Sequence, residues 1–394
     1  MKVTWQQVAR GRLRRQLLVE PAPDALAVAR RLCGLHAQVA SSTTLITGVR
    51  SAAPAALEAA LWTDHTLVRT WAMRGTLHLL PADELDLWVG ALTDRESRRR
   101  FPPSWEREHG VSAAQLHTIT DAVGEVLGEV PMTRAELADA VCGHLGDPAL
   151  AAPLSTGWGA LLKPAATRGL LCSGPAADGT VTFVGPAAWL GRPLAPVEPE
   201  VANREVLLRF LAANGPATAG DVARWWGEQP APAKRWIREA REAITAVEVD
   251  GEAGFVVHAE DADELGATPD EPAGAVALLP GFDPWVIAPI SHRKRAVPAG
   301  RESEVSRPAG WVSPVLVVDG AVTGSGRTRS PATGWRSPSA PSLHRRPRCG
   351  ARSSGTATAV SAEVLDVPSS PCRRVAWGPV WRSGGIGAVR GCLP

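Results

Sequence analysis

One order of predicted elements recurs along residues 1–260, and it constrains the fold more than any other feature of the sequence. A copy contains a helix, a second helix that opens on a Thr-x-x-Glu or Thr-x-x-Asp capping box, a longer helix and a short hairpin. Three helices followed by a two-stranded hairpin are the elements of a winged helix-turn-helix. We therefore predict an α+β fold built of tandem winged helix-turn-helix units.

The clearest copy is the third one along the chain. Apolar spacing predicts its first helix over 200–213, and Thr218 with Asp221 three positions later forms the capping box of the second helix. A third helix is predicted over 232–244, and Asp250, which precedes a glycine, marks the turn of a hairpin. Three tryptophans of this copy are expected in its core: Trp225, Trp226 and Trp236.

The second copy repeats this order. Its first helix is predicted over 115–127, Thr133 and Glu136 make a complete capping box, and Asp178 marks the hairpin turn. The first copy is weaker, because its elements rest on residue spacing alone. We expect its helices over 24–34 and 54–62 and its strand pair over 67–80.

The expected divisions follow from these copies. In chain order they are a first unit with a candidate catalytic loop at 1–112, a second unit at 113–198, a third unit at 199–265, a β-rich closing segment at 270–327 and an irregular tail at 328–394. Short strands are expected in the closing segment at 276–279, 285–287 and 315–318.

Charge is distributed unevenly along the chain. Residues 327–394 contain 11 arginines and two acids, whereas the whole chain has a net charge of +2, so the preceding residues are net acidic. An acidic body argues against indiscriminate, salt-driven binding of nucleic acid and requires a local basic face for any DNA. The tail itself has the composition of a disordered segment, and equally that of GC-rich DNA translated in a shifted frame.

Several classes of protein are disfavoured by composition. No apolar run approaches the roughly 18 residues of a membrane span, and the first residues lack the apolar stretch of a secretion signal, so a cytoplasmic protein is expected. The six cysteines never occur as Cys-x-x-Cys, which disfavours a zinc module and a disulfide scaffold. No phosphate-cradling glycine loop is recognisable. We expect neither a metal nor a cofactor.

Four phrases of the sequence resemble the motifs of one bacterial family. They are Gly34-Leu-His-Ala-Gln38, Leu67-Val-Arg-Thr-Trp-Ala-Met-Arg-Gly-Thr-Leu-His78, Leu278-Leu-Pro-Gly-Phe-Asp-Pro284 and Gly310-Trp-Val-Ser-Pro-Val-Leu-Val-Val-Asp-Gly320. Together they resemble the tandem winged-helix DNA-binding family that includes the AlkZ/YcaQ-type DNA glycosylases. The resemblance covers residues 1–326 and ends at Arg327, where members of the family would continue with an amphipathic C-terminus; this favours a frame error over a genuine tail.

The family's catalytic signature is a glutamine followed two positions later by glutamine or aspartate. Here the corresponding residues are His36 and Gln38, so the second position matches and the first does not. Gly34 is a plausible helix terminator, and on an extended segment two residues so spaced face the same way. The resemblance then implies that Gln38 orients a water molecule, with His36 as a general base near pKa 6.5. The alternative is that both side chains only cap the end of the helix.

Polar residues interrupt the predicted strand pair of the first copy. They are Arg69, Arg74, Thr76 and His78, which we take as candidate DNA-binding residues, and a tight turn at Arg74 would place its guanidinium beside a phosphate or in a minor groove. The alternative is a core hairpin in which Arg69 pairs with Asp64.

The third copy has a basic helix. Lys234, Arg235 and Arg238 lie at helical spacing, as expected of a helix that meets DNA. Glu239 and Glu242 are interleaved with them, so a solvated face with ion pairs inside the helix is the alternative.

These observations predict a monomeric protein that binds duplex DNA. The resemblance implies a glycosylase-like hydrolase of N-glycosidic bonds that acts on alkylated bases in DNA repair. One alternative is a non-enzymatic winged-helix regulator of transcription that has kept the scaffold and lost the chemistry. Another is a scaffold for protein interactions that binds no DNA.

Overall fold

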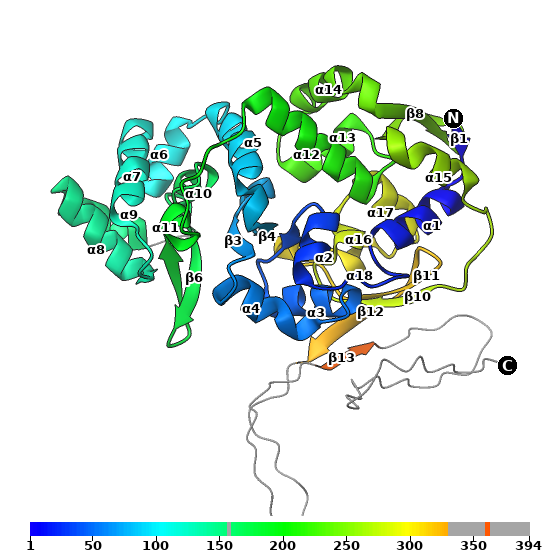
Figure 1. The fold of residues 1–394 in the computed structure, drawn as a ribbon, viewed down its shortest axis with the longest axis horizontal. Coiled ribbons are helices and arrows are strands. Elements are labelled where there is room, and N and C mark those ends of the chain that lie inside the picture. Colours follow the sequence, from blue (N-terminus) through cyan, green and yellow to red (C-terminus); the bar gives the residue numbers. More distant parts are fainter. Residues whose placement is uncertain (156–158, 330–358, 363–394) are drawn as a thin grey trace, which may run out of the picture.

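The computed structural model describes residues 1–155, 159–329 and 359–362. These residues form a mixed α and β structure with many helices and four small sheets (Figure 1). None of the helices in this part of the chain is long and apolar enough to cross a membrane. The expected tail at 328–394 lies almost entirely outside the described residues.

The first set of elements follows α1 (Trp5–Arg15). It contains α2 (Ala25–Arg31), β2 (Leu35–His36), α3 (Ala40–Arg50), α4 (Leu57–Trp62), β3 (Leu67–Trp71) and β4 (Leu77–Pro81). The three strands form an antiparallel sheet in the order β2-β4-β3. The strand pair expected over 67–80 is confirmed, whereas α3, which begins without a side-chain cap, was not expected.

The second set repeats this order. It contains α7 (Ala113–Val126), β5 (Met132–Thr133), α8 (Arg134–Leu145), α9 (Ala151–Ser155), α10 (Lys163–Thr167), β6 (Cys172–Ala177) and β7 (Thr180–Val184), with the sheet order β5-β7-β6. The capping box is confirmed, because the Thr133 side chain accepts from the Glu136 amide and Glu136 accepts from the Thr133 amide. Asp178 has φ 49°, in the left-handed region, as the predicted hairpin turn requires.

The third set contains α12 (Pro199–Asn214), α13 (Ala219–Trp226), α14 (Pro230–Glu239), β8 (Ile244–Val249) and β9 (Glu252–His258), followed by α15 (Ala262–Ala267). The capping box of Thr218 and Asp221 and the turn at Asp250 are both confirmed. The expected core tryptophans are buried. One strand was not expected: β1 (Lys2–Val3) joins this sheet in parallel beside β8, so the first residues of the chain pack on the third set.

Three further helices connect the sets. They are α5 (Leu85–Ser97), α6 (Pro103–His109) and α11 (Pro186–Trp189). Helix α5 packs along α12, and its Trp88 is fully buried. Gly90 of this helix has no room for a side chain, because an added Cβ would lie 2.1 Å from the carbonyl oxygen of Val197. The close approach of backbone to backbone at Gly90 therefore holds the chain after the second set against α5.

The closing segment contains β10 (Val276–Leu279), α16 (Pro284–Ile287), α17 (Ile290–Ala296), α18 (Glu302–Val305), β11 (Val315–Val318), β12 (Ala321–Arg329) and β13 (Ala359–Ala362). The strands expected at 276–279 and 315–318 are confirmed. The strand expected at 285–287 is wrong, because this stretch forms α16. Asp283 accepts a hydrogen bond from the Trp285 amide and Pro284 occupies the first helical position, so a cap and a proline start a helical turn that apolar content alone does not reveal.

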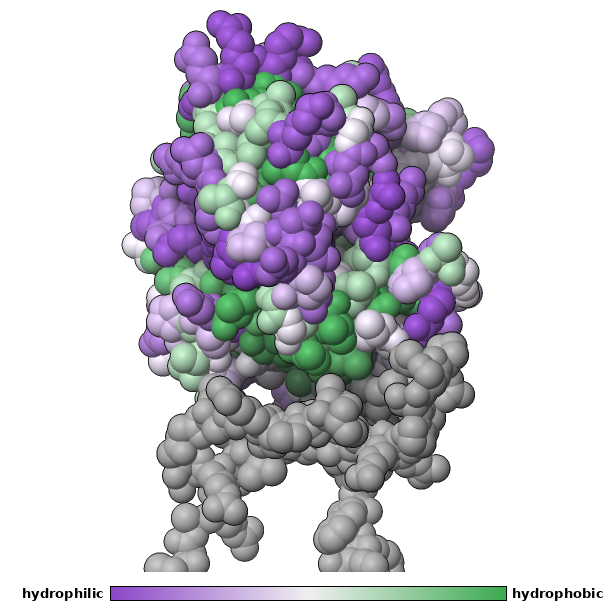
Figure 2. Space-filling view, turned by 90° about the vertical axis from the view of Figure 1, so that its right-hand side faces the viewer, coloured by the Kyte–Doolittle hydropathy of each residue, from purple (hydrophilic) through white to green (hydrophobic). Residues whose placement is uncertain are grey.

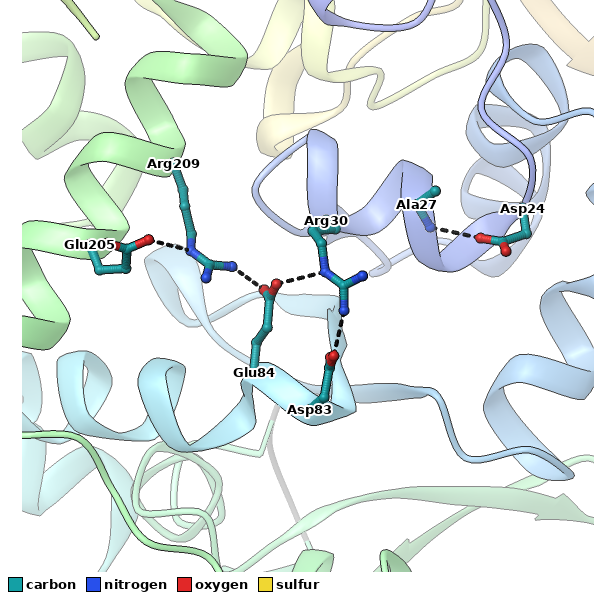
Figure 3. A network of polar contacts seen from close by, with 7 residues as sticks. All are labelled: Asp24, Ala27, Arg30, Asp83, Glu84, Glu205 and Arg209. Carbon is teal, nitrogen blue, oxygen red and sulfur yellow. Dashed lines mark hydrogen bonds and ion pairs between the residues drawn. The ribbon is translucent and has the colours of Figure 1, made fainter. Parts of the chain in front are cut away.

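A carboxylate shared by two arginines links the first and third sets (Figure 3). Glu84, which ends the 3-10 turn η3 (Ala82–Glu84), lies between Arg30 of α2 and Arg209 of α12 and accepts from both. Arg30 also pairs with Asp83 at 2.6 Å, and Arg209 with Glu205.

One face of the molecule differs in hydropathy from top to bottom. Seen from the right-hand side of Figure 1, this face is mostly hydrophilic above and displays apolar side chains below, at the level of β10 to β12 (Figure 2).

A buried ion pair joins the closing segment to the first set. Both side-chain nitrogens Nη1 and Nη2 of Arg50, on α3, lie 2.8 Å from the carboxylate oxygens of Asp283, and both side chains are fully buried. The Nε of Arg50 donates to the carbonyl of Gln16, at the end of α1. One guanidinium therefore connects α1, α3 and α16.

We expect Asp283→Asn to destabilise the protein by about 3 kcal/mol or more, because it leaves the charge of Arg50 buried and unpaired. Asparagine keeps an oxygen that can cap α16, so the loss of stability arises from the broken ion pair rather than from a lost cap. Denaturant unfolding measures the effect. Asp83→Asn, at the surface ion pair with Arg30, is the matched control and should cost at most about 1 kcal/mol. Equal effects of the two substitutions would contradict a structural role for the buried pair.

Candidate active site

The candidate catalytic residues lie on a short strand that follows a sharp turn. Helix α2 ends before Cys33 and Gly34, which have φ 59° and φ 86°. A side chain at Gly34 would contact Leu80 and Met73 at 3.0 Å, so glycine serves both the left-handed backbone and the close packing. The chain reverses here and continues as β2, so the extended conformation expected at His36 is confirmed.

Strand β2 ends at His36, and Gln38 lies in the bend that follows it. Ala37 between them is buried in the core of the first set. The Gln38 side chain is exposed, and its Oε1 accepts a hydrogen bond from the Leu77 amide at 3.1 Å. This contact fixes the orientation of the amide and leaves its Nε2 as a donor toward the outside.

His36 is buried among aromatic rings. Its ring stacks on Phe282 at 5.2 Å between centroids and meets His78 edge-on at 5.6 Å. The side chain is 8% exposed, and among the described residues its Nδ1 has no hydrogen-bond partner. A buried polar atom without a partner is costly, so this nitrogen is suited to a water molecule or a ligand.

Both histidines of the pair are held neutral. Burial, with a smaller contribution from Arg74, lowers the pKa of His36 to about 4, and burial lowers the pKa of His78 well below its usual value. The expectation of a pKa near 6.5 at His36 is therefore wrong for the folded chain. The Nδ1 of His78 lies 2.9 Å from the carbonyl oxygen of Thr76, so in the neutral ring it is Nδ1 that bears the proton and donates.

The polar residues of the hairpin have different positions. Arg74 lies in the turn η2 (Met73–Gly75) with φ 55°, and its Nη1 donates to the carbonyl of Trp225 on α13. Thr76 donates to the carbonyl of Met73, and Arg69 donates to the carbonyl of Ala37, between the two candidate residues. The ion pair of Arg69 with Asp64, considered as an alternative, is not among those formed by the described residues.

The basic residues of the third set lie elsewhere. Lys234, Arg235 and Arg238 are exposed on α14, which Figure 1 shows at the top of the molecule and apart from β4. Arg235 lies 3.6 Å from Glu239, the intrahelical pairing that the sequence allowed. The structure thus brings Arg69 and His78 into contact with the segment of His36 to Gln38 and Thr76 against His78, with Arg74 in the adjoining turn, and it places the α14 residues on a separate surface.

Comparison with known proteins decides the family. The family described as DNA glycosylase AlkZ-like matches residues 29–366. This chain belongs to the AlkZ-like DNA glycosylase family. An interstrand DNA cross-link repair glycosylase of Streptomyces sahachiroi is 37% identical over 334 residues, which cover 82% of this chain and 88% of that protein. The structure of the Streptomyces sahachiroi DNA glycosylase AlkZ has a TM-score of 0.76 at 34% identity, and the match covers 86% of this chain and 93% of that chain.

The AlkZ-like match confirms the resemblance seen in the sequence and extends it. The mixed α and β architecture is shared with the AlkZ structure. The family match runs to residue 366, beyond Arg327, where the resemblance was expected to end.

Sequence reasoning did not identify Phe282 as part of this AlkZ-like site. Phe282 has φ 61° and follows β10, and the neighbouring Asp283 is fixed by Arg50. Trp311 meets the Phe282 ring edge-on at 5.0 Å and is 48% exposed, so a series of aromatic rings leads from the surface to His36. The only signal was the phrase at 278–284, which gave no reason to place a ring on His36.

Metal ligands do not gather at this site. Within residues 1–155, 159–329 and 359–362, no group of three or more His, Cys, Asp or Glu side chains has the arrangement of a metal site. Cys33, which precedes β2, is a buried free thiol whose pKa burial raises strongly.

The low pKa of His36 predicts a pH dependence of stability. Because this pKa is about 4 in the folded chain and about 6.5 in an unfolded one, the folded protein binds fewer protons between these values. The contribution of His36 is therefore fully present above about pH 6.5 and is lost as the pH falls toward 4. His36→Gln should reduce this slope by about one proton, measured by urea unfolding across the range.

The exposed His117 on α7 provides the matched control, His117→Gln. A slope that His36→Gln leaves unchanged would show that His36 is protonated in the folded protein.

Proposed function

We propose that this protein is a monofunctional DNA-repair glycosylase that hydrolyses the N-glycosidic bond of alkylated bases in duplex DNA. One observation carries the proposal: the unpartnered Nδ1 of His36 and the exposed amide of Gln38 lie two residues apart at the end of β2, in a chain of the AlkZ-like family. The Streptomyces sahachiroi relative is named for repair of interstrand cross-links, so bases carrying bulky cross-linking adducts are included in the proposed substrates.

In the proposed reaction, Gln38 holds the attacking water and His36 accepts a hydrogen bond from it. The oxygen of the water bonds to C1′ of the deoxyribose as the bond from C1′ to the base nitrogen breaks. The base nitrogen keeps the electron pair, so a cationic alkylated purine leaves as a neutral molecule. A proton of the water is lost to His36 or to solvent.

Neutral histidines suit this chemistry. Positive charge develops on the sugar as the base leaves, and an imidazolium at the same place would repel it. The low pKa of His36 keeps the ring uncharged at neutral pH. As a consequence, His36 is a weak base, and we assign the larger catalytic role to the water position set by Gln38.

We propose that the three sets of elements are winged helices, at 1–112, 113–198 and 199–265. The repeated order of helix, strand, two or more helices and a hairpin supports this, as does the addition of a third strand to the hairpin in the first two sets. In the third set, Ala217 makes the corresponding bridge to Val256.

Roles for the basic residues follow from their positions. We propose that Arg74, in the exposed turn beside the site, contacts DNA phosphate, while Arg69 and His78 position β2 and the residues after it, which include Gln38. Thr76 orients His78 through its carbonyl. The exposed cations of α14, Lys234, Arg235 and Arg238, are proposed as an additional contact to duplex phosphates, and the protein is proposed to act as a monomer.

Gln38→Ala should lower release of 7-methylguanine from duplex DNA by about 100-fold or more, because it removes the group that positions water. Binding of the same duplex should be nearly unchanged. Single-turnover base release and fluorescence anisotropy measure the two quantities. His36→Gln should retain release, because it recreates the signature of the family. Gln6→Ala, on α1, removes an amide elsewhere and is the control.

The alternatives predict different results from the same assays. A protein that binds the duplex but releases no base, with all its variants equal, would be a non-enzymatic DNA-binding regulator. A protein that binds no DNA at low salt would be a scaffold for protein interactions.

A further inference from the structure

A cleft of about 440 Å³ is bordered by the turn between β3 and β4. Its charged lining consists of five cations, Arg74, Arg95, Arg98, Arg99 and Lys163, and two acids, Glu96 and Glu228. The cations come from the turn η2, from helix α5 and the two residues that follow it, and from helix α10, so the first and second sets both contribute.

Only part of this positive charge is neutralised by the protein. Arg98 pairs with Asp94 and Glu228, and Arg99 pairs with Glu96. These contacts account for both acids of the cleft.

The other three cations of the cleft have no acidic partner within 4 Å in the described part of the chain. Arg74 donates to the carbonyl of Trp225, and Arg95 donates to the carbonyls of Trp226 and Ala72. The side chain of Lys163 forms neither a hydrogen bond nor an ion pair with any described residue, although the residue is half-buried. Its ammonium lies beside Gly75, 3.7 Å from the place that a Cβ there would occupy.

The positive charge continues beyond the cleft. Burial and then the neighbouring Arg224 and Arg95 lower the pKa of Arg74 to about 10. Burial and then Arg99 lower the pKa of Lys163, and burial and then Arg224 lower the pKa of Arg293.

Helix α13, which bears Arg224, packs against both the turn η2 and helix α17. The basic track therefore comprises Lys163 of α10, Arg99 just after α5, Arg95 of α5, Arg74 of the turn, Arg224 of α13 and Arg293 of α17. Like charges held together in partly buried positions repel each other, and a bound anion relieves this repulsion.

The turn between β3 and β4 connects the cleft to the site. Arg74 and Gly75 border the cleft, and two residues later the Leu77 amide holds Gln38. We propose that the cleft binds a backbone phosphate of DNA next to the nucleotide whose base occupies the candidate site, and that Lys163 is the residue whose charge this phosphate neutralises. The track then follows the DNA strand toward α13 and α17. The location beside a nucleotide rests on the proposed function, whereas the phosphate contact does not.

Lys163→Ala tests the phosphate contact on the full chain with an undamaged duplex. Fluorescence anisotropy at several salt concentrations, between about 50 and 200 mM, gives the slope of log affinity against log salt. Loss of one phosphate contact should reduce this slope by about 0.9 and lower the affinity about fivefold to tenfold at low salt. Lys163→Arg should keep most of both. Lys2→Ala, at an exposed lysine paired with Glu248 on the β1 edge, removes an equal charge elsewhere and is the matched control.

A duplex with single neutral methylphosphonate linkages locates the contact. For the wild type, one linkage beside the lesion should weaken binding, and Lys163→Ala should be insensitive to the same linkage. If Lys163→Ala changes neither the salt dependence of binding nor the sensitivity to the neutral linkages, the inference is overturned, whether or not the protein releases a base. If Lys163→Ala changes both but the wild-type protein releases no base, the result counts against the proposed function alone.

A small phosphate ligand is the other source of the same chemistry. Calorimetric titration with a nucleoside 5′-monophosphate distinguishes it. Tight binding of this mononucleotide that Lys163→Ala abolishes, with duplex affinity unchanged, would assign the cleft to a small molecule and overturn the DNA contact.

Discussion

The guanidinium of Arg50 and the carboxylate of Asp283 meet by two hydrogen bonds with no access to water, and the geometry of the site depends on this contact. Asp283 follows Phe282 directly, so the ion pair that anchors one also places the ring of the other on His36. The same arginine reaches the end of α1. Burial of two charges is costly unless both are paired and hydrogen-bonded. Here both charges are paired and hydrogen-bonded, and the contact connects three segments that are distant in sequence, α1, α3 and α16.

Charge is divided between the candidate active site and the neighbouring cleft. At His36 and His78, burial keeps the imidazole groups neutral, as the proposed chemistry, which generates a cation, requires. In the cleft, Arg74 and Lys163 present positive charge without acidic partners among the described residues. A nucleotide has the same division between an anionic phosphate and a sugar that becomes positive. The turn between β3 and β4 connects the two environments within a few residues.

Local signals in the sequence predicted local structure well. The capping box of Thr218 and the turn at Asp250 depend on side chains and backbone angles within four residues, so their outcome is set before any tertiary packing. Features that depend on distant residues were missed. The ring of Phe282 reaches His36 because of an ion pair with α3, and the strand expected at 285–287 became a helix because Asp283 caps it. A motif in the sequence indicated the candidate pair of His36 and Gln38. The low pKa of His36 could not be predicted from the sequence, because it depends on burial by Phe282 and His78.

The pairing of β1 with β8 has a consequence for the order in which contacts form as the protein folds. Lys2 and Val3 pair with Glu248 and Val249, and the Met1 amino group donates to Ala246, 245 positions away. A ribosome therefore releases β1 long before its partner strand exists. The hairpin of β8 and β9 can form from neighbouring residues, whereas the third strand of the sheet must be recruited across this distance. Contacts so distant in sequence form late, so β1 joins the sheet after the local contacts of the third set.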